Sequence, residues 1–200
     1  MAETTPGRRP APPREEVFAV AMAAIAEHGL AELTMAGLGR RLGMSGGHLL
    51  YYFGSKDQLL LETLRWSEDE LGERRRAALG EPLPAAARLD SFVALYLPTG
   101  AGDPRWTLWV EVWGRSLAVA PMRAGQAAIE AAWRADLVAL LREGIAGREF
   151  RTVDPERFAV RLSALLDGFG TPLVTGLPGT DRERAIEHIT EYLDESLHLH

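Results

Sequence analysis

A succession of helix start and stop signals constrains this chain of 200 residues more than any other sequence feature. Ser, Thr or Asp stands where most of its periodic apolar segments begin, and Gly or Pro follows where they end. No segment alternates apolar and polar residues as a half-buried strand does. We therefore predict an all-α fold of about nine helices, at residues 14–29, 34–42, 45–53, 55–79, 85–97, 104–118, 122–143, 155–170 and 181–197.

A break rich in Gly and Pro at residues 80–84 separates these helices into two groups. Residues 1–13, which are rich in Pro, Gly and Ala, are expected to form a mobile arm. We expect residues 14–56 to form a three-helix domain and residues 57–79 a long connecting helix. Residues 80–200 would then form a second helical domain.

The net charge of −6 argues mildly against a nucleic-acid partner, but the acidic residues are unevenly distributed. Residues 1–56 hold six basic and five acidic residues, a net charge of +1, which leaves −7 for the rest of the chain. The run Arg74-Arg75-Arg76 is expected to face solvent. Cysteine is absent, which excludes disulfides, and no run of about 18 apolar residues occurs. We expect a cytoplasmic protein with no membrane partner.

Residues 34–56 have the pattern of a helix-turn-helix, in which a tight turn joins two helices and the second helix is short. Gly43 and Met44 would form the turn. Such a motif presents its second helix to the major groove of DNA, with donors to phosphate at both flanks. The alternative is a plain three-helix cluster in which Tyr51, Tyr52 and Phe53 are core residues, and the pattern alone leaves both interpretations open.

The run from Thr34 to Leu60 resembles the signature of the TetR family, and the similarity covers residues 14–65. The only lysine of the chain, Lys56, stands at the lysine of this signature. The resemblance implies a DNA-binding transcriptional regulator that acts as a homodimer on a pseudo-palindromic, double-stranded operator. It implies phosphate contacts from Thr34, Tyr51, Tyr52 and Lys56, and a recognition helix that uses Ser45, Gly46, Gly47, His48 and Leu50.

Trp106, Trp109 and Trp113 share one face of a predicted helix, because three and four residues separate them. An aromatic cage suits a cation, for which Glu111 or Asp167 would supply the counter-charge. Alternatively, the tryptophans are core or dimer contacts. The candidate ligand pocket consists of Phe92, Tyr96, Trp106, Trp109, Trp113, Trp133 and Phe169.

Residues 105–176 are similar to the C-terminal domain of BetI-like regulators within the TetR family. The similarity lies in Trp-x-x-Trp-x-x-x-Trp, then Pro121-Met-Arg, then Ala164-Leu-Leu-Asp-Gly168. It points to choline and betaine metabolism and leaves the small-molecule effector itself unknown. Pro172 departs from the pattern and is expected to kink or end its helix.

The last two predicted helices each carry an apolar face at helical spacing. The family resemblance implies that both helices pair with their mates in a second subunit. The alternative is that these faces form only the core of one chain. The candidate interface residues are Phe158, Leu162, Leu165, Leu166, Ile186, Ile189 and Leu193.

The sequence contains no Gly-rich phosphate loop, no His-Glu-x-x-His and no nucleophile elbow. We therefore expect no cofactor, no metal and no enzymatic activity. His188 and Glu191 lie one turn apart but lack a third ligand. The leading hypothesis is a repressor that a small molecule releases from its operator. The alternatives are an activator, a regulator controlled by a protein partner, and a small-molecule-binding enzyme or carrier on the same fold.

Overall fold

The structure, a computed structural model, describes residues 12–198 and contains nine helices within them. The predicted all-α fold is confirmed, since the only β-pairing in these residues is an isolated antiparallel bridge between Phe150 and His198. Most of the expected mobile arm lies outside the described residues. The helices are α1 (Arg14–Glu32), α2 (Met35–Leu42), α3 (Gly46–Phe53), α4 (Lys56–Leu79), α5 (Ala85–Tyr96), α6 (Pro104–Ser116), α7 (Ala120–Ala146), α8 (Pro155–Thr175) and α9 (Arg182–Ser196).

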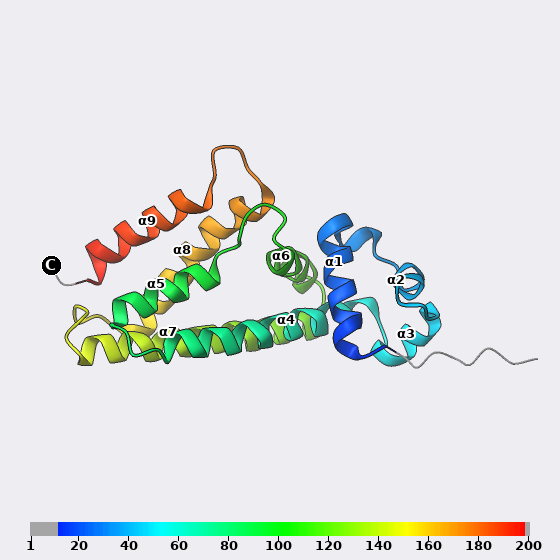
Figure 1. The fold of residues 1–200 in the computed structure, drawn as a ribbon, viewed down its shortest axis with the longest axis horizontal. Coiled ribbons are helices and arrows are strands. Elements are labelled where there is room, and N and C mark those ends of the chain that lie inside the picture. Colours follow the sequence, from blue (N-terminus) through cyan, green and yellow to red (C-terminus); the bar gives the residue numbers. More distant parts are fainter. Residues whose placement is uncertain (1–11, 199–200) are drawn as a thin grey trace, which may run out of the picture.

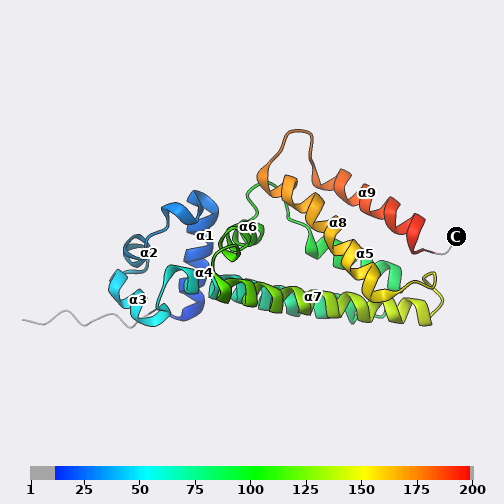
Figure 2. The ribbon, with the colours of Figure 1, turned by 180° about the vertical axis from the view of Figure 1, so that it is seen from behind.

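The helices form an elongated molecule with α1, α2 and α3 clustered at one end (Figure 1). α4 leaves this cluster and runs beside α7, and α5, α8 and α9 lie over one side of this pair. α6 crosses near the junction, where it packs against α1, α4 and α7 (Figure 2). α4 and α6 are thus the two helices that connect the small cluster to the rest of the molecule.

Two clusters of buried apolar side chains hold these helices together. One lies among α5, α7, α8 and α9 and includes Phe92, Trp133 and Leu166. The other joins α1, α2 and α3 to the first half of α4, and it also contains Leu108, Trp109, Val112 and Met122 of α6 and α7. α6 therefore shares a core with the helix-turn-helix unit, although it follows the break at residues 80–84.

Side chains cap most of the helices, whereas α1, α5 and α7 begin without a side-chain cap. Asp103 caps α6 and Asp154 caps α8, and in both helices a proline occupies the first turn. The run Thr180-Asp181-Arg182-Glu183 has the pattern of a capping box with Thr180 as the cap, but Asp181 caps α9, because its side chain accepts from the backbone N–H of Arg184. A carboxylate at the N-terminus also suits the helix dipole better than a hydroxyl does.

Glycine and proline act differently on α1 and α8. Gly29 interrupts α1 as predicted, with φ 76° and ψ 163°, a conformation that only glycine adopts without strain. Pro172 does not end its helix, because α8 continues to Thr175. Its missing N–H deprives a carbonyl one turn earlier of its partner, but that carbonyl belongs to the exposed Gly168, where water can replace it.

Replacing Asp103 with alanine is expected to destabilise the fold by about 1–2 kcal/mol at neutral pH. Its buried carboxylate accepts hydrogen bonds from the Thr99 N–H (2.8 Å), the Thr99 hydroxyl (2.8 Å) and the Trp106 N–H (3.1 Å). Burial alone would raise the pKa of Asp103, but these bonds outweigh it and lower the pKa below its ordinary value of 3.8. The stabilisation is therefore fully present above pH 3.8 and is lost as the pH falls through the lower folded-state pKa.

Urea unfolding of the wild type and the Asp103→Ala variant over a range of pH measures this difference. Asp181→Ala is the control, because the exposed Asp181 caps α9 through a single bond from the Arg184 N–H. We expect a smaller loss of stability for the control. A loss for Asp103→Ala that does not shrink in acid contradicts the role given to this carboxylate.

Candidate DNA-binding and effector sites

The turn between α2 and α3 brings the two helices into backbone contact at glycines. A Cβ atom on Gly39 would lie 2.6 Å from the carbonyl oxygen of Met44, and one on Gly46 would lie 2.8 Å from backbone atoms of Ala36. Gly43 closes α2 in the left-handed region, with φ 68°. The crossing of α2 and α3 therefore depends on two glycines for space and on a third for its dihedral angle.

α3 exposes aromatic residues that the helix-turn-helix interpretation assigns to DNA contact. Tyr51 is 83% exposed, Tyr52 49% and Leu50 46%, whereas Phe53 is buried. The alternative, in which all three aromatic residues belong to a three-helix core, is therefore wrong for Tyr51 and Tyr52. Only Phe53 lies in the core. The ring of His48 lies beside that of Tyr52, with 4.9 Å between their centroids. An exposed aromatic group of this size points to an interaction surface.

The two glycines at the start of α3 differ in what surrounds them. No atom lies within 4 Å of the place that a Cβ on Gly47 would occupy, so this position is open on the surface. The corresponding place on Gly46 is filled by the backbone of α2. Gly46 thus packs α3 against α2, which gives this glycine a structural role, and its contact with DNA stays a prediction.

The starts of α2, α3 and α4 each carry a hydroxyl cap. Thr34, Ser45 and Ser55 accept hydrogen bonds from backbone N–H groups three residues later, at 3.0, 3.1 and 3.0 Å. Lys56 follows directly, with its Nζ 3.5 Å from the carbonyl oxygen of Ala31. Exposed hydroxyls and a cation beside helix N-termini form a surface on which phosphate groups are favoured.

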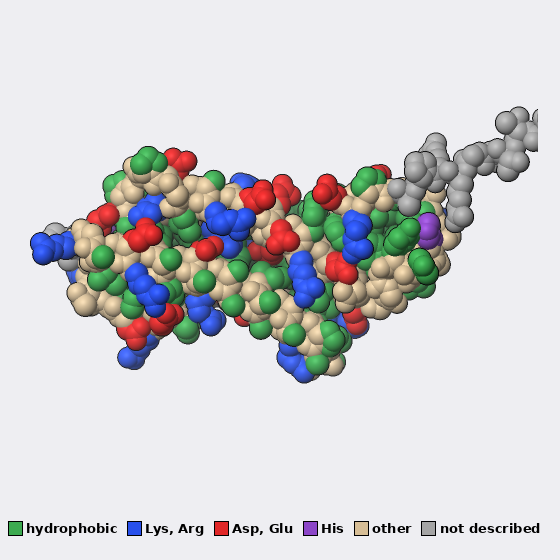
Figure 3. All heavy atoms as spheres, turned by 90° about the horizontal axis from the view of Figure 1, so that it is seen from below, with side chains coloured by type: hydrophobic (Ala, Val, Ile, Leu, Met, Phe, Trp, Pro, Cys, Tyr) green, Lys and Arg blue, Asp and Glu red, His purple; other side chains and the backbone are tan. Residues whose placement is uncertain are grey.

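The distribution of charged residues also favours DNA binding at this surface. Residues 33–56 contain no acidic residue, although the whole chain has a net charge of −6. Figure 3 shows acidic and basic side chains interspersed along α4 and α7, and mainly hydrophobic side chains toward the helix-turn-helix at the right. The approach of DNA to α3 therefore meets little repulsion from carboxylates.

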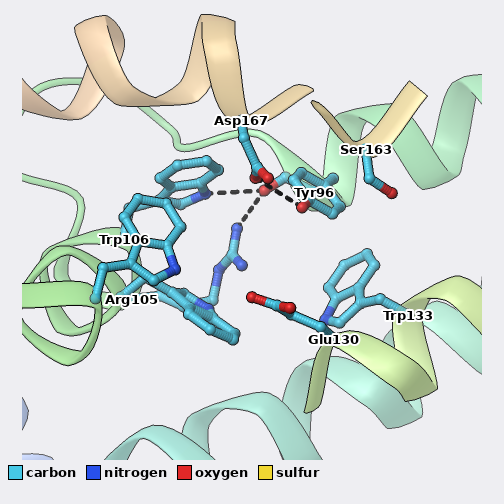
Figure 4. A pocket seen from close by; sticks show the side chains of 9 residues that line it. Tyr96, Arg105, Trp106, Glu130, Trp133, Ser163 and Asp167 are labelled. Carbon is cyan, nitrogen blue, oxygen red and sulfur yellow. Dashed lines mark hydrogen bonds between the residues drawn. The ribbon is translucent and has the colours of Figure 1, made fainter. Parts of the chain in front are cut away.

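A small cavity lies between α5, α6, α7 and α8 (Figure 4). Its volume is about 40 Å³. Because a single water needs roughly 10–15 Å³, the cavity has room for a few waters. It is lined by Tyr96, Arg105, Trp106, Trp109, Trp113, Glu130, Trp133, Ser163 and Asp167.

The aromatic rings of the cavity meet edge to face. Ring centroids lie 5.8 Å apart for Trp106 and Trp113, 6.2 Å for Tyr96 and Trp106, and 5.0 Å for Tyr96 and Trp133. The indole N–H of Trp106 donates to the carbonyl oxygen of Tyr96 at 2.9 Å. Gly170 allows this packing, because a Cβ there would lie 2.1 Å from the Trp106 ring. Their negatively polarised faces make the rings a suitable surface for a cation.

The charges at the cavity are predominantly negative. The Tyr96 hydroxyl donates to Asp167 at 2.8 Å (Figure 4), and Glu130 lies at the opposite side of the space. Burial, and then the charge of Glu130, raises the pKa of Asp167 against the opposing effect of the Tyr96 hydrogen bond. Arg105 supplies the positive charge, but its Nη1 is 3.3 Å from Glu68 and is thus already paired. A bound cation would find carboxylates that lack a charged partner.

Most of the predicted pocket residues come together, but two do not. Tyr96 and the four predicted tryptophans line the cavity. Phe92 is fully buried against Trp133, and the half-buried Phe169 stacks on His188, so neither of these two residues lines the cavity as predicted. Sequence reasoning missed Arg105, Glu130 and Ser163, and only their helical spacing from Trp109, Trp133 and Asp167 could have suggested them.

The predicted dimer interface is largely an internal core. Phe158, Leu162, Leu166, Ile189 and Leu193 are buried within the single chain, so they have no surface to offer a partner. Leu165 and Ile186 are half-buried against the same core. For the five buried residues, the alternative that the apolar faces of α8 and α9 pack within one chain is therefore correct. The exposed face of α8 carries Val160, Ala164 and Gly168 instead.

Two absences hold within the described part of the chain. No helix of residues 12–198 is long and apolar enough to cross a membrane. In the same residues, no group of three or more His, Cys, Asp and Glu side chains is arranged to hold a metal ion.

Family comparisons agree with this geometry. Residues 17–63 match the family described as bacterial regulatory proteins of the tetR family, and residues 85–198 match the C-terminal domain of BetI-type transcriptional repressors. The second match covers more than half of the chain. The chain belongs to the TetR family. Its C-terminal domain is of the BetI type, and it is a DNA-binding transcriptional regulator, a class of proteins that are not enzymes.

Individual relatives extend the family assignment. This chain is 34% identical over 107 residues to the HTH-type transcriptional regulator BetI 2 of Chromohalobacter salexigens, and the match covers about half of each chain. It is 28% identical to BetI of Serratia proteamaculans over 94% of this chain and 93% of that protein. A transcriptional regulator from Saccharomonospora viridis, solved in complex with choline, superimposes with a TM-score of 0.86 at 29% identity. That similarity covers 94% of this chain and 98% of the other.

Replacing Lys56 with alanine is expected to weaken binding to all DNA sequences alike and to reduce the salt dependence of binding. Each phosphate contact contributes about 0.9 to the slope of log K against log salt, so the slope should fall by about one per subunit. Fluorescence anisotropy over a salt series measures it. Arg134→Ala removes an equal charge from the exposed side of α7 and should leave the slope unchanged. Equal slopes for the Lys56→Ala variant and the wild type contradict a phosphate contact.

Proposed function

We propose that this TetR-family regulator is a homodimeric repressor that leaves its operator when a small quaternary ammonium ion of the choline class occupies the tryptophan cavity. The observation that carries the proposal is the cavity itself, in which five aromatic rings and two carboxylates face one space. Aromatic cages recognise quaternary ammonium groups because the ring faces attract a cation that cannot donate hydrogen bonds. Choline is also the molecule bound by the related regulator from Saccharomonospora viridis.

The carboxylates favour a cation over a neutral ligand of the same shape. Glu130 and Asp167 line the cavity, while Arg105 is engaged by Glu68 and by the carbonyl oxygens of Leu95 and Tyr96. A positive ligand would relieve the repulsion between the two carboxylates and would favour the ionised form of Asp167.

Polar contacts of α6 provide a route from the cavity to the DNA-binding unit. Glu111 accepts a hydrogen bond from the Leu30 N–H at 2.8 Å, directly after the break of α1. One turn later, Arg115 donates to both carboxylate oxygens of Asp57 in the first turn of α4, at 2.9 and 2.6 Å. Cavity residues and these contacts lie on the same helix, so a shift of α6 on ligand binding moves α1 and the start of α4.

The exposed face of α8 is the proposed dimer surface. Val160, Ala164 and Gly168 are spaced by four residues on one side of this helix, and all three are exposed. Val160 offers an apolar contact, and the small Ala164 and Gly168 allow a second copy of α8 to approach closely about a two-fold axis. Two recognition helices would then meet two half-sites of a pseudo-palindromic operator in the cytoplasm.

The test measures release of operator DNA by choline and by its neutral isostere, 3,3-dimethyl-1-butanol. DNA selection from genomic fragments first identifies the operator, and fluorescence anisotropy then follows both titrations. Since a desolvated cation–π contact contributes about 2 kcal/mol, choline should act at concentrations roughly 30-fold lower than the isostere. Equal potency of the two compounds contradicts the cation site. Tighter DNA binding with choline contradicts the repressor mechanism, and no calorimetric signal with choline contradicts the effector class.

A further inference from the structure

α4 carries a buried carboxylate that lies behind the cavity wall. Glu68 is 5% exposed, and its two oxygens accept separate hydrogen bonds from the indole N–H groups of Trp109 (2.7 Å) and Trp133 (2.8 Å). Trp109 belongs to α6 and Trp133 to α7. Arg105 completes the environment, with its Nη1 3.3 Å from Glu68 Oε1. A buried ion pair stabilises a core less than apolar packing does, so filling space does not by itself account for this carboxylate.

A second residue of α4 holds the same indole. Arg75, seven residues after Glu68, lies with its Cζ 3.9 Å from the centroid of the Trp133 ring. Its Nε donates to Asp136 at 2.6 Å, and it is 3% exposed, which corrects the expectation that the whole run of three arginines faces solvent. Trp133 is therefore held by α4 at its N–H and at one ring face, while the residue also lines the cavity.

A ligand in the cavity acts directly on these contacts, because Trp109 and Trp133 both line the space that it would fill. Trp109 and Trp133 cannot both move away from α4 without losing their hydrogen bonds to Glu68. Breaking them would leave a buried charge with fewer donors, which is unfavourable, so we expect α4 to follow the indoles.

We propose that Glu68 is the positioning residue through which α4 responds to the ligand: it ties two walls of the cavity to the helix that begins at Lys56. This inference rests on the proposed function, and it concerns how strongly ligand and operator binding are coupled. By reciprocity, the same contacts make the cavity respond to DNA. Loss of Glu68 should therefore separate the two binding events while each of them survives.

The Glu68→Gln variant tests this role. Glutamine offers one acceptor oxygen in place of two, so one indole N–H loses its partner while the volume stays the same. The measured quantity is the ratio of the operator Kd with saturating choline to the operator Kd without it. Coupling of this kind is typically about 5–150-fold, and in the variant the ratio should fall toward one while calorimetry still detects choline. Glu73→Gln, at an exposed site of the same helix, is the control and should keep the wild-type ratio.

An unchanged ratio in the Glu68→Gln variant overturns the inference. If that variant does not fold, Trp109→Phe and Trp133→Phe each remove one N–H and keep a ring, and unchanged ratios in both overturn it as well. If choline does not release the wild type, the proposed function fails and DNA becomes the probe. Operator DNA should then shift the indole ¹⁵N–¹H signals of Trp109 and Trp133 in the wild type and leave them unmoved in Glu68→Gln. Signals that do not respond to DNA in the wild type overturn the inference.

Discussion

Changing Gly46 to alanine is expected to weaken operator binding roughly 100-fold, which corresponds to about 3 kcal/mol, at the upper end of the range for overpacking. The added Cβ would lie 2.8 Å from the backbone of Ala36, and backbone, unlike the end of a flexible side chain, cannot turn aside. α3 must therefore tilt or move away from α2. The exposed surface that carries Tyr51 then no longer fits the groove.

Gly47→Ala is the matched control for the effect of an added methyl group on the packing of α3. It adds the same methyl group one residue later, where no atom lies within 4 Å, so the helix should keep or gain stability. Thermal unfolding and operator binding by anisotropy compare the two variants, and choline binding reports on the C-terminal domain. Operator binding by Gly46→Ala at wild-type strength contradicts the packing role that we assign to this glycine.

Replacing Trp113 with leucine is expected to weaken choline binding by roughly 30-fold, the equivalent of one desolvated cation–π contact of about 2 kcal/mol. Leucine keeps an apolar side chain but has no ring face to attract a cation. Trp113 suits this experiment because it is half-buried, whereas Trp106 is fully buried against Gly170 and its loss would disturb the fold. Isothermal titration calorimetry measures the effect.

The neutral isostere and a distant tryptophan provide the controls. Binding of 3,3-dimethyl-1-butanol should change much less in Trp113→Leu, because it has no charge for the ring to attract. Trp66→Leu alters a tryptophan that packs on Phe18 in the helix-turn-helix core, away from the cavity, and should leave choline affinity unchanged. Equal losses for choline and the isostere would show that Trp113 contributes apolar contact only.

Most helix starts and the exposed face of α3 could be predicted from the sequence because their causes are local. The caps at Thr34, Ser45 and Ser55 bond to N–H groups only three residues away. The exposure of Tyr51 and the burial of Phe53 follow from the same short helix, once the family signature identifies its faces. The resemblance of residues 14–65 therefore predicts which face of this helix is exposed, and the DNA contacts themselves stay a prediction.

The cavity was only partly predictable. Spacing placed Trp106, Trp109 and Trp113 on one face of α6, but it gave no information on which charges lie opposite them. Glu130 and Arg105 join the cavity through the packing of α6 against α7, and Glu68 reaches Trp133 across 65 positions of the chain. Hydrophobic periodicity says nothing about such polar partners, because it records only which face is apolar.

By itself, the sequence determined the nine helices, the helix-turn-helix and the aromatic character of the second domain, because hydrogen bonds and spacing within one or two turns specify them. Only the tertiary structure decided where each apolar face points. Leu162 and Ile189 belong to an internal core rather than to a partner surface, and Gly46 packs against the backbone of α2. Both outcomes depend on how each helix is rotated against its neighbours, and contacts between residues far apart in the chain fix that rotation.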